Sequence, residues 1–138
     1  MEVEASSPIG DKLPTIFVSV RVIDRGESKL EVLIRAKELC QYTLHIAKNE
    51  KVFPKRDRWL LTKPIVDYTI FIYTSLMEAN EIKVETHDDY VRRRNLQKLA
   101  LEKCAPLLSL MQIAYENISA LDGRRVEHWT GLVIKLKE

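Results

Sequence analysis

The segment 53–80 constrains the fold of this chain more than any other. It begins with several basic residues and then becomes almost wholly apolar, with no glycine to interrupt it. Drawn as a helix, it carries two apolar stripes at a spacing of three and four residues, which stacks side chains along one face. The first stripe is Leu61, Ile65, Tyr68, Ile72, Leu76 and Ala79. The second is Trp59, Val66, Ile70, Tyr73 and Met77. Because a surface helix needs only one such stripe, we expect this helix to be covered on a second side as well.

The residues 65–74 also have the composition of a strand, since β-branched and aromatic side chains dominate them. Length favours the helix, because strands commonly run for roughly 4–8 residues. Pro64 lies inside the predicted helix, where proline removes a backbone hydrogen bond and clashes with the preceding turn. We therefore expect a kink at Pro64. Pro54, in contrast, suits a first helical position.

Three further amphipathic segments complete the predicted fold. Ser28 and Glu31 form a capping box for a helix that runs to about Asn49. Thr86 and Asp89 form a second capping box, at the start of the next of these helices. The core stripe of the first of these helices is Leu33, Ala36, Cys40, Leu44 and Ala47. The second runs from about residue 88 to 118, bends at Pro106, and has the stripe Leu96, Ala100, Cys104, Leu107, Met111, Ala114 and Ile118. The last follows a turn at Asp122-Gly123 and carries Val126, Trp129, Val133 and Leu136.

Four helices joined by short links predict an all-α fold, an up-down-up-down four-helix bundle over residues 28–138. Residues 1–27 are predicted to be an N-terminal extension with a short β-strand-like segment at 15–24, where apolar and polar residues alternate. A single strand has no partner within a helical domain. We expect it either to lie on the bundle or to pair with another copy of the chain.

The composition limits the functional classes. A chain of 138 residues forms one domain with a proper core. No apolar run is long enough to span a membrane and the N-terminus lacks a signal-peptide core, so a cytoplasmic protein is expected. Cys40 and Cys104 stand alone on predicted core faces, which predicts buried, reduced thiols.

The sequence offers no constellation for catalysis. His45, His87 and His128 lie far apart without neighbouring cysteines or clustered carboxylates, so no metal or other cofactor is expected. A Gly-rich phosphate loop, a Ser–His–Asp arrangement and an HExxH motif are all missing from the sequence. Trp59 and Trp129 are interpreted as core or interface anchors, and Trp59, next to Arg58, as an alternative contact for a partner. We therefore expect a protein without enzymatic activity.

The distribution of charge suggests a binding function. The net charge is only +2, but residues 51–63 hold five basic residues and one acidic residue, and so do residues 91–103. Both clusters stand at predicted helix starts, where cations are disfavoured and attract anions. The candidate nucleic-acid-binding residues are Lys51, Lys55, Arg56, Arg58, Lys63, Arg92, Arg93, Arg94, Lys98, Arg124 and Arg125. Aromatic residues do not alternate with them, which predicts contact with phosphates rather than bases. From spacing alone, a solvated charged surface explains them equally well.

Several of these residues also carry a resemblance to a known family. Phe53-Pro54-Lys55 with Arg58, a long apolar helix that closes on Glu78-Ala79-Asn80, and a following helix that opens with arginines resemble the accessory variability determinant of diversity-generating retroelements. That family belongs with the four-helix-bundle proteins encoded in ribosomal-RNA intervening sequences, and the likeness covers roughly residues 28–136. The resemblance implies a non-catalytic ring, usually a pentamer, that binds a reverse transcriptase and template RNA or RNA/DNA to support mutagenic complementary-DNA synthesis.

Two functional hypotheses follow. The first is an accessory protein of a retroelement that binds RNA electrostatically and docks a reverse transcriptase. The second is a protein–protein adaptor bundle without RNA affinity, whose basic residues meet an acidic partner. In both cases we expect a homo-oligomer, because the second apolar stripe exceeds what one bundle consumes. The predicted interface residues are Trp59, Val66, Ile70, Tyr73 and Met77.

Overall fold

The computed structural model describes residues 27–137, so the predicted strand-like segment 15–24 lies outside the described residues. The chain divides into two compact units, Met1–Val32 and Leu33–Glu138. Of the first unit, only the opening turns of a helix are described. The second unit contains the rest of that helix and all the elements that follow it.

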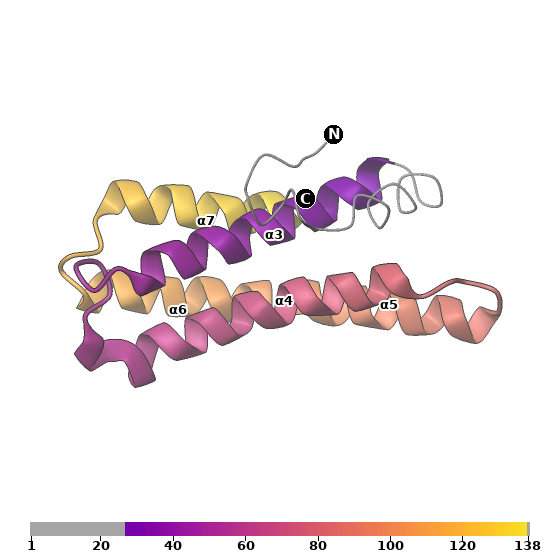
Figure 1. The fold of residues 1–138 in the computed structure, drawn as a ribbon, viewed down its shortest axis with the longest axis horizontal. Helices are drawn as coiled ribbons and strands as arrows, with labels where there is room; N and C mark the ends of the chain where they lie inside the picture. The colour runs from indigo at the N-terminus through magenta and orange to yellow at the C-terminus, as the bar shows by residue number, and fades with distance from the viewer. Residues whose placement is uncertain (1–26, 138) are drawn as a thin grey trace. The chain divides into compact units, whose positions relative to one another are not determined.

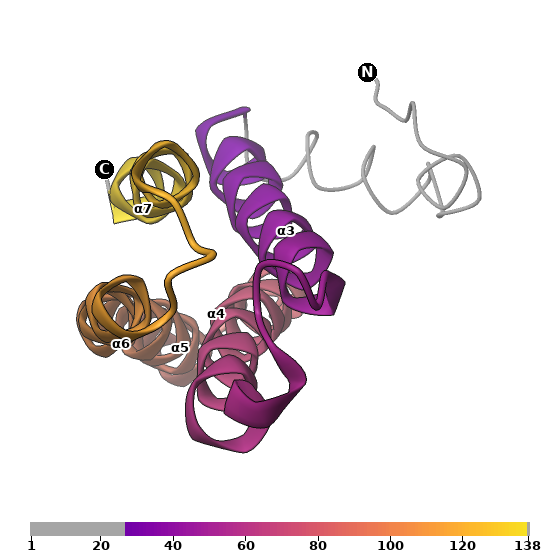
Figure 2. The ribbon, with the colours of Figure 1, turned by 90° about the vertical axis from the view of Figure 1, so that its left-hand side faces the viewer.

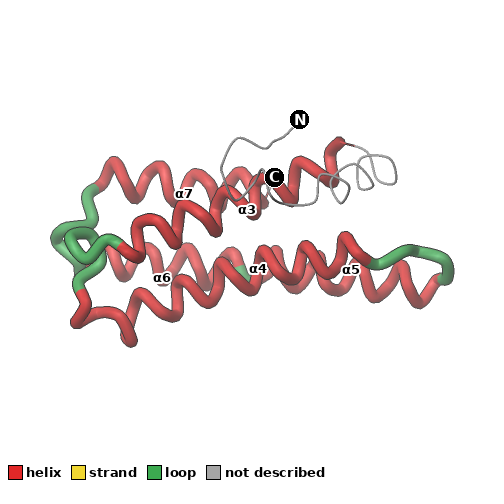
Figure 3. Tube along the Cα trace, in the orientation of Figure 1, coloured by secondary structure: helices red, strands yellow, loops and turns green. Residues whose placement is uncertain are grey.

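The described residues outside the links are helical, which confirms the predicted all-α class (Figure 3). The elements are α3 (Glu27–Lys48), a 3₁₀ turn η1 (Lys55–Asp57), a π-helical turn η2 (Arg58–Thr62), α4 (Lys63–Glu81), α5 (His87–Glu102), α6 (Cys104–Asn117) and α7 (Gly123–Lys137). Only Lys103 separates α5 from α6. The described chain thus has four helical segments, compatible with a helical bundle.

Within the second unit, the helices pack side by side (Figures 1 and 2). Helix α4 contacts α5 and α6, and α6 contacts α7. Helix α3 is tied to α7, because the Arg35 guanidinium donates a hydrogen bond of 3.0 Å to the carbonyl of Lys135. Cys40 of α3 lies next to Thr69 of α4. The α3–α4 and α6–α7 links lie at one end, on the left of Figure 1, and the α4–α5 link lies at the other.

The core agrees with most of the predicted stripes. Buried apolar side chains of the predicted third and fourth helices include Ala100, Cys104, Leu107, Met111, Ala114, Ile118, Trp129, Val133 and Leu136. In α3 the prediction is wrong at two positions, because Leu44 and Ala47 are only half-buried while Thr43 and Ile46 are buried. Thr43 fits the interior because its hydroxyl donates to the carbonyl of Leu39 at 2.8 Å and so leaves no unpaired polar group.

The first apolar stripe of the predicted long helix is largely buried, and the second is not. Ile65, Ile72, Leu76 and Ala79 are buried. Of the second stripe, Val66, Tyr73 and Met77 are half-buried, whereas Ile70 and Trp59 are exposed. Among residues 27–137, the side of α4 that carries the first stripe is therefore better covered than the side that carries Ile70.

Both prolines that were expected to disturb a helix lie next to irregular backbone. Before Pro64, the N–H of Lys63 donates to the carbonyl of Arg58, five residues back, so that a π-turn precedes the regular helix. Pro64 then lies in the first turn of α4, where a missing N–H is tolerated. Pro106 lies in the first turn of α6, and the break at Lys103 stands where a bend was predicted. Pro54 precedes η1 by one residue instead of beginning the helix.

Capping explains where the helices start. The predicted box at Thr86 is confirmed, since the Thr86 hydroxyl accepts the N–H of Asp89 at 3.1 Å and the Asp89 carboxylate accepts the N–H of Thr86 at 3.2 Å. Helix α3 begins at Glu27, so Ser28 lies inside its first turn rather than at its cap. Asp122 accepts the N–H of Arg125 at 2.7 Å where α7 begins. No described helix combines the length and apolarity needed to span a membrane.

Candidate nucleic-acid interface

The first basic cluster lies on a well-anchored turn at one end of the bundle. We call residues 49–63 the α3–α4 tip. Val52 and Phe53 are buried, and their N–H groups both donate to the carbonyl of Asn49 at 2.9 Å. The Phe53 ring packs edge-on against Trp129, with 5.7 Å between the ring centroids. The polypeptide that carries the cations is thus fixed to the core, while the cations Lys51, Lys55, Arg56, Arg58 and Lys63 are all exposed.

Acidic neighbours neutralise only part of this cluster. Lys63 pairs with Asp67 at 2.7 Å, one helical turn on. Arg58 approaches Glu50 only to 3.9 Å, the outer limit of an ion pair. Between residues 27 and 137, Lys55 and Arg56 have no ion-pair partner. The tip therefore presents at least two free positive charges to solvent.

Two large apolar side chains stand among these cations. Trp59 is 73% exposed and Leu60 is 75% exposed. Trp59 was predicted to continue the second stripe of α4, but η1 and η2 interrupt the α-helical period between Trp59 and Val66. A π-turn holds more residues than an α-turn, so Trp59 does not keep the register that the stripe requires. Sequence reasoning missed Leu60, and the only signal for it was an apolar pair directly after a cationic run.

The second basic cluster contains three cations that are exposed to solvent and one that is hydrogen-bonded within the protein. Arg92, Arg94 and Lys98 are exposed on α5. Arg93 is half-buried and donates from Nη2 to the carbonyl of Ile82 at 2.7 Å and from Nε to the carbonyl of Ala79 at 3.3 Å. These carbonyls close the C-terminal end of α4, where a cation is favoured. Arg93 is thus held by the protein itself.

The third pair, Arg124 and Arg125, lies at the start of α7. Arg124 is exposed, whereas Arg125 is half-buried and pairs with Asp122 at 3.2 Å. The α6–α7 link and the α3–α4 link share one end of the bundle (Figures 1 and 2). The α4–α5 link, from which α5 begins, lies at the other end. The structure therefore brings the tip cations and this pair to one end and leaves the cations of α5 apart from them.

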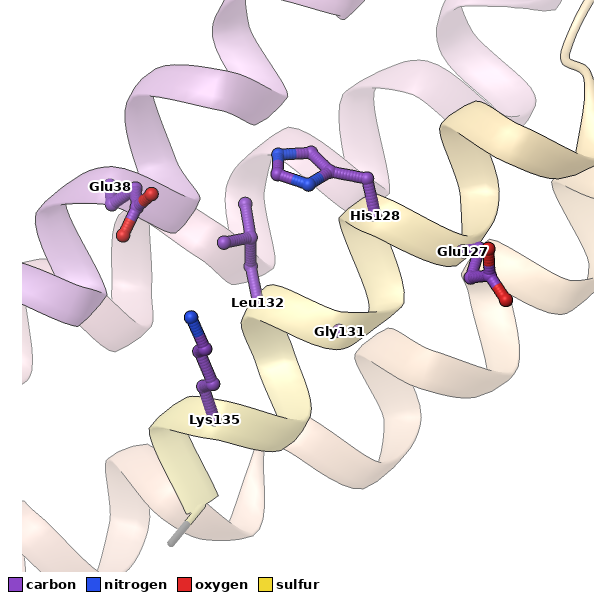
Figure 4. Close-up of a pocket in the computed structure, with 6 residues that line it drawn as sticks. All are labelled: Glu38, Glu127, His128, Gly131, Leu132 and Lys135. Atoms are coloured by element: carbon purple, nitrogen blue, oxygen red, sulfur yellow. The ribbon is translucent and has the colours of Figure 1, made fainter.

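A shallow hollow of about 200 Å³ lies between α3 and α7 (Figure 4). Its lining residues are Glu38, Glu127, His128, Gly131, Leu132 and Lys135. Figure 4 shows Glu127 pointing away from Glu38, and both carboxylates are exposed. The His128 ring instead packs edge-on against Tyr42, with 4.7 Å between centroids. The hollow therefore lacks a converging pair of buried acid–base groups.

Burial shifts the pKa of both cysteines and of one tyrosine on α4. Burial raises the pKa of the Cys40 thiol, against a smaller lowering by the hydrogen bond with Thr69. Burial also raises the pKa of Cys104 and of Tyr73. Both cysteines are free and buried, as predicted, and a neutral buried thiol is a poor nucleophile. Within residues 27–137, no cluster of three or more His, Cys, Asp or Glu side chains is arranged to hold a metal ion.

No protein-family model, no characterised protein and no solved structure matches the chain.

Proposed function

We propose that this chain is a non-catalytic accessory protein of a retroelement, which binds RNA through its phosphates and docks a reverse transcriptase. The resemblance to the accessory variability determinant motivates the partners. The observation that carries the proposal is the anchored α3–α4 tip, where Lys55 and Arg56 are exposed without an ion-pair partner among residues 27–137. In this proposal the helices run up-down-up-down, so that the α3–α4 and α6–α7 links and their cations face one end.

Phosphate binding is the chemistry that such cations favour. A protein that neutralises phosphates releases condensed counterions, so its affinity falls as the salt concentration rises. For single strands, each phosphate contact contributes roughly −0.7 to the slope of log affinity against log salt concentration. The exposed cations of α5 supply a second, separate site. Because each site alone is weak, the effective concentration within an oligomer raises the affinity of the whole.

We further propose a homo-oligomer that uses the uncovered side of α4. Ile70 is 40% exposed, and Val66, Tyr73 and Met77 flank it half-buried. The resemblance implies a pentamer, whereas the apolar surface implies only that a partner exists.

The test is RNA binding by fluorescence anisotropy at several salt concentrations. One variant replaces Lys55, Arg56 and Arg58 by Ala, and the other replaces Arg92, Arg94 and Lys98 by Ala while keeping Arg93. Each variant should lose affinity for all RNA sequences alike. The slope of log affinity against log salt concentration should become shallower by the equivalent of about two phosphate contacts, roughly 0.7 each. Lys83→Ala is the matched control, because Lys83 is exposed in the α4–α5 link and already paired with Glu85 at 3.5 Å.

Two results would overturn the proposal. Wild-type protein that binds no RNA at low salt lacks the function altogether. Binding that neither triple variant changes would show that these cations do not contact RNA. In either case, binding of an acidic peptide that the triple variants abolish would favour the adaptor hypothesis instead.

A further inference from the structure

The exposed Trp59 requires an explanation that the cations alone do not give. The two tryptophans of the chain have opposite environments, since Trp129 is fully buried and Trp59 is 73% exposed. Tryptophan is one of the largest apolar side chains, and its exposure at a protein surface commonly marks a binding site. Leu60, 75% exposed, extends the same apolar surface by one residue.

The backbone holds Trp59 outward. On its N-terminal side, the N–H of Asp57 donates to the carbonyl of Pro54 at 3.0 Å, directly after the buried Phe53. On its C-terminal side, Thr62 and Ile65 are buried. The core side of this turn is therefore occupied by other residues, and Trp59 lies on an ordered π-turn rather than in a loose loop. Single π-turns within helices are frequent at functional sites.

The charges around the indole select an anionic ligand. Arg58 precedes Trp59 directly, and its only ion-pair partner among the described residues, Glu50, is 3.9 Å away. Lys55 and Arg56 lie on η1, the turn directly before the π-turn, and are exposed. A flat aromatic face beside exposed cations is the combination that single-stranded nucleic acids use, with a base stacked on the ring and the phosphates on the cations.

We infer that Trp59 is a stacking platform for an unpaired base, so that the α3–α4 tip prefers single-stranded over double-stranded nucleic acid. The inference rests on the proposed RNA binding and adds the strand type and the residue that selects it. Bases in a duplex are already stacked on each other, and their faces are closed to a side chain. Phosphate contacts by Lys55, Arg56 and Arg58 do not distinguish the two forms in this way. Selectivity for single strands must therefore come from Trp59.

Two other occupants of this surface are less well supported. A membrane surface would also attract cations, but only Trp59 and Leu60 are available for insertion, because the next residues, Leu61 and Thr62, are half-buried and buried. So small an apolar anchor gives marginal membrane binding. A second copy of the chain would bring the same cations together, which like-charge repulsion opposes.

The indole itself reports the interaction. Because Trp129 is buried, the change in tryptophan fluorescence on adding a ligand arises from Trp59. The probes are a uridine RNA of about 12 nucleotides, within the span of known single-strand sites, and a duplex RNA of the same length. Single-stranded RNA should quench the emission at saturation, whereas duplex RNA should leave it nearly unchanged even where anisotropy shows that the duplex is bound.

Trp59→Leu tests the contribution to affinity. It keeps an apolar side chain and every charge, and should weaken single-strand binding by roughly 5- to 150-fold, the range of one stacked base. Its affinity for duplex RNA and its salt dependence should stay as in the wild type. Trp59→Phe, which keeps a smaller aromatic face, should lose less. Val84→Ala serves as the control, since it removes an exposed apolar side chain from the α4–α5 link, at the other end of the helices.

The outcomes separate this inference from the proposed function. If RNA binds by anisotropy but Trp59→Leu has the wild-type affinity and the wild-type emission is not quenched, stacking is wrong and phosphate binding stands. If no RNA binds, both fail. A blue shift on vesicles of anionic phospholipid without RNA quenching identifies a membrane surface instead, and a concentration-dependent blue shift of the protein alone identifies self-association through Trp59.

Discussion

At the scale of single residues, the pair Thr43 and Trp129 shows how a polar side chain enters the core. The indole N–H of Trp129 donates to the hydroxyl of Thr43 at 2.9 Å, and both residues are fully buried. The sequence predicts that Trp129 is an anchor, because its helical spacing is clear. It does not predict the partner, which lies on another helix and falls between the apolar residues of the expected stripe. The same limit applies to Arg93, whose carbonyl acceptors are known only once α4 and α5 are paired.

Thr43→Val should therefore destabilise the fold although it conserves side-chain shape. The substitution leaves the buried indole N–H without an acceptor, which costs about 1–3 kcal/mol in the free energy of unfolding. Urea unfolding followed by circular dichroism measures this loss. Thr74→Val is the control, because the exposed Thr74 hydroxyl donates only to carbonyls of its own helix, those of Ile70 and Phe71. Equal losses in the two variants would contradict a role for the buried hydrogen bond.

At the scale of elements, regular helices were predictable and irregular turns were not. The apolar period and the box at Thr86 place the starts and ends of the four helical segments within a few residues, because both signals are local in sequence. Pro64 predicts a disturbance, but periodicity cannot distinguish a kinked α-helix from the 3₁₀ and π turns found at 55–62. The tip geometry therefore escaped prediction, and with it the exposure of Trp59 and Leu60.

The capping box at the start of α5 should make stability depend on pH. The N–H of Glu85 first, and Thr86 after it, hold the pKa of Asp89 below its usual value of 3.8. A carboxyl group with a lowered folded pKa stabilises the fold fully above 3.8 and loses this effect as pH falls through the folded pKa. Asp89→Ala should thus lower Tm at neutral pH, and its difference from the wild type should narrow in acid. Thermal melts between neutral pH and about pH 2 test this. A difference that stays constant with pH, or an equal one in Asp88→Ala, would contradict it.

At the scale of the second unit, the helices do not cover one another equally. Helix α7 has 15 residues, whereas α5 and α6 have 16 and 14. At about 1.5 Å per residue, α7 spans only about half of the length of α5 and α6 together. Ala100 is accordingly the single buried residue of α5, while Tyr90, Val91 and Leu99 are exposed. The sequence already indicates this mismatch of lengths, but the charge distribution gives no sign of which faces remain open.

The open side of α4 leads to the prediction that the chain self-associates at micromolar concentration. Ile70 is exposed between the half-buried Val66 and Tyr73, and such apolar surface gains about 25 cal/mol per Å² when covered. Ile70→Glu would place a carboxylate without a partner in the contact, so it should weaken association at least about tenfold, or 1.4 kcal/mol. Light scattering measures the mass, and circular dichroism must show unchanged helix content. Ser109→Glu, which adds the same charge at an exposed position of α6, is the control. Wild-type protein that is monomeric at these concentrations would refute the interface. If the wild type is an oligomer and both glutamate variants preserve it, the interface does not lie on α4 but on another face, such as that of Tyr90 and Leu99 on α5.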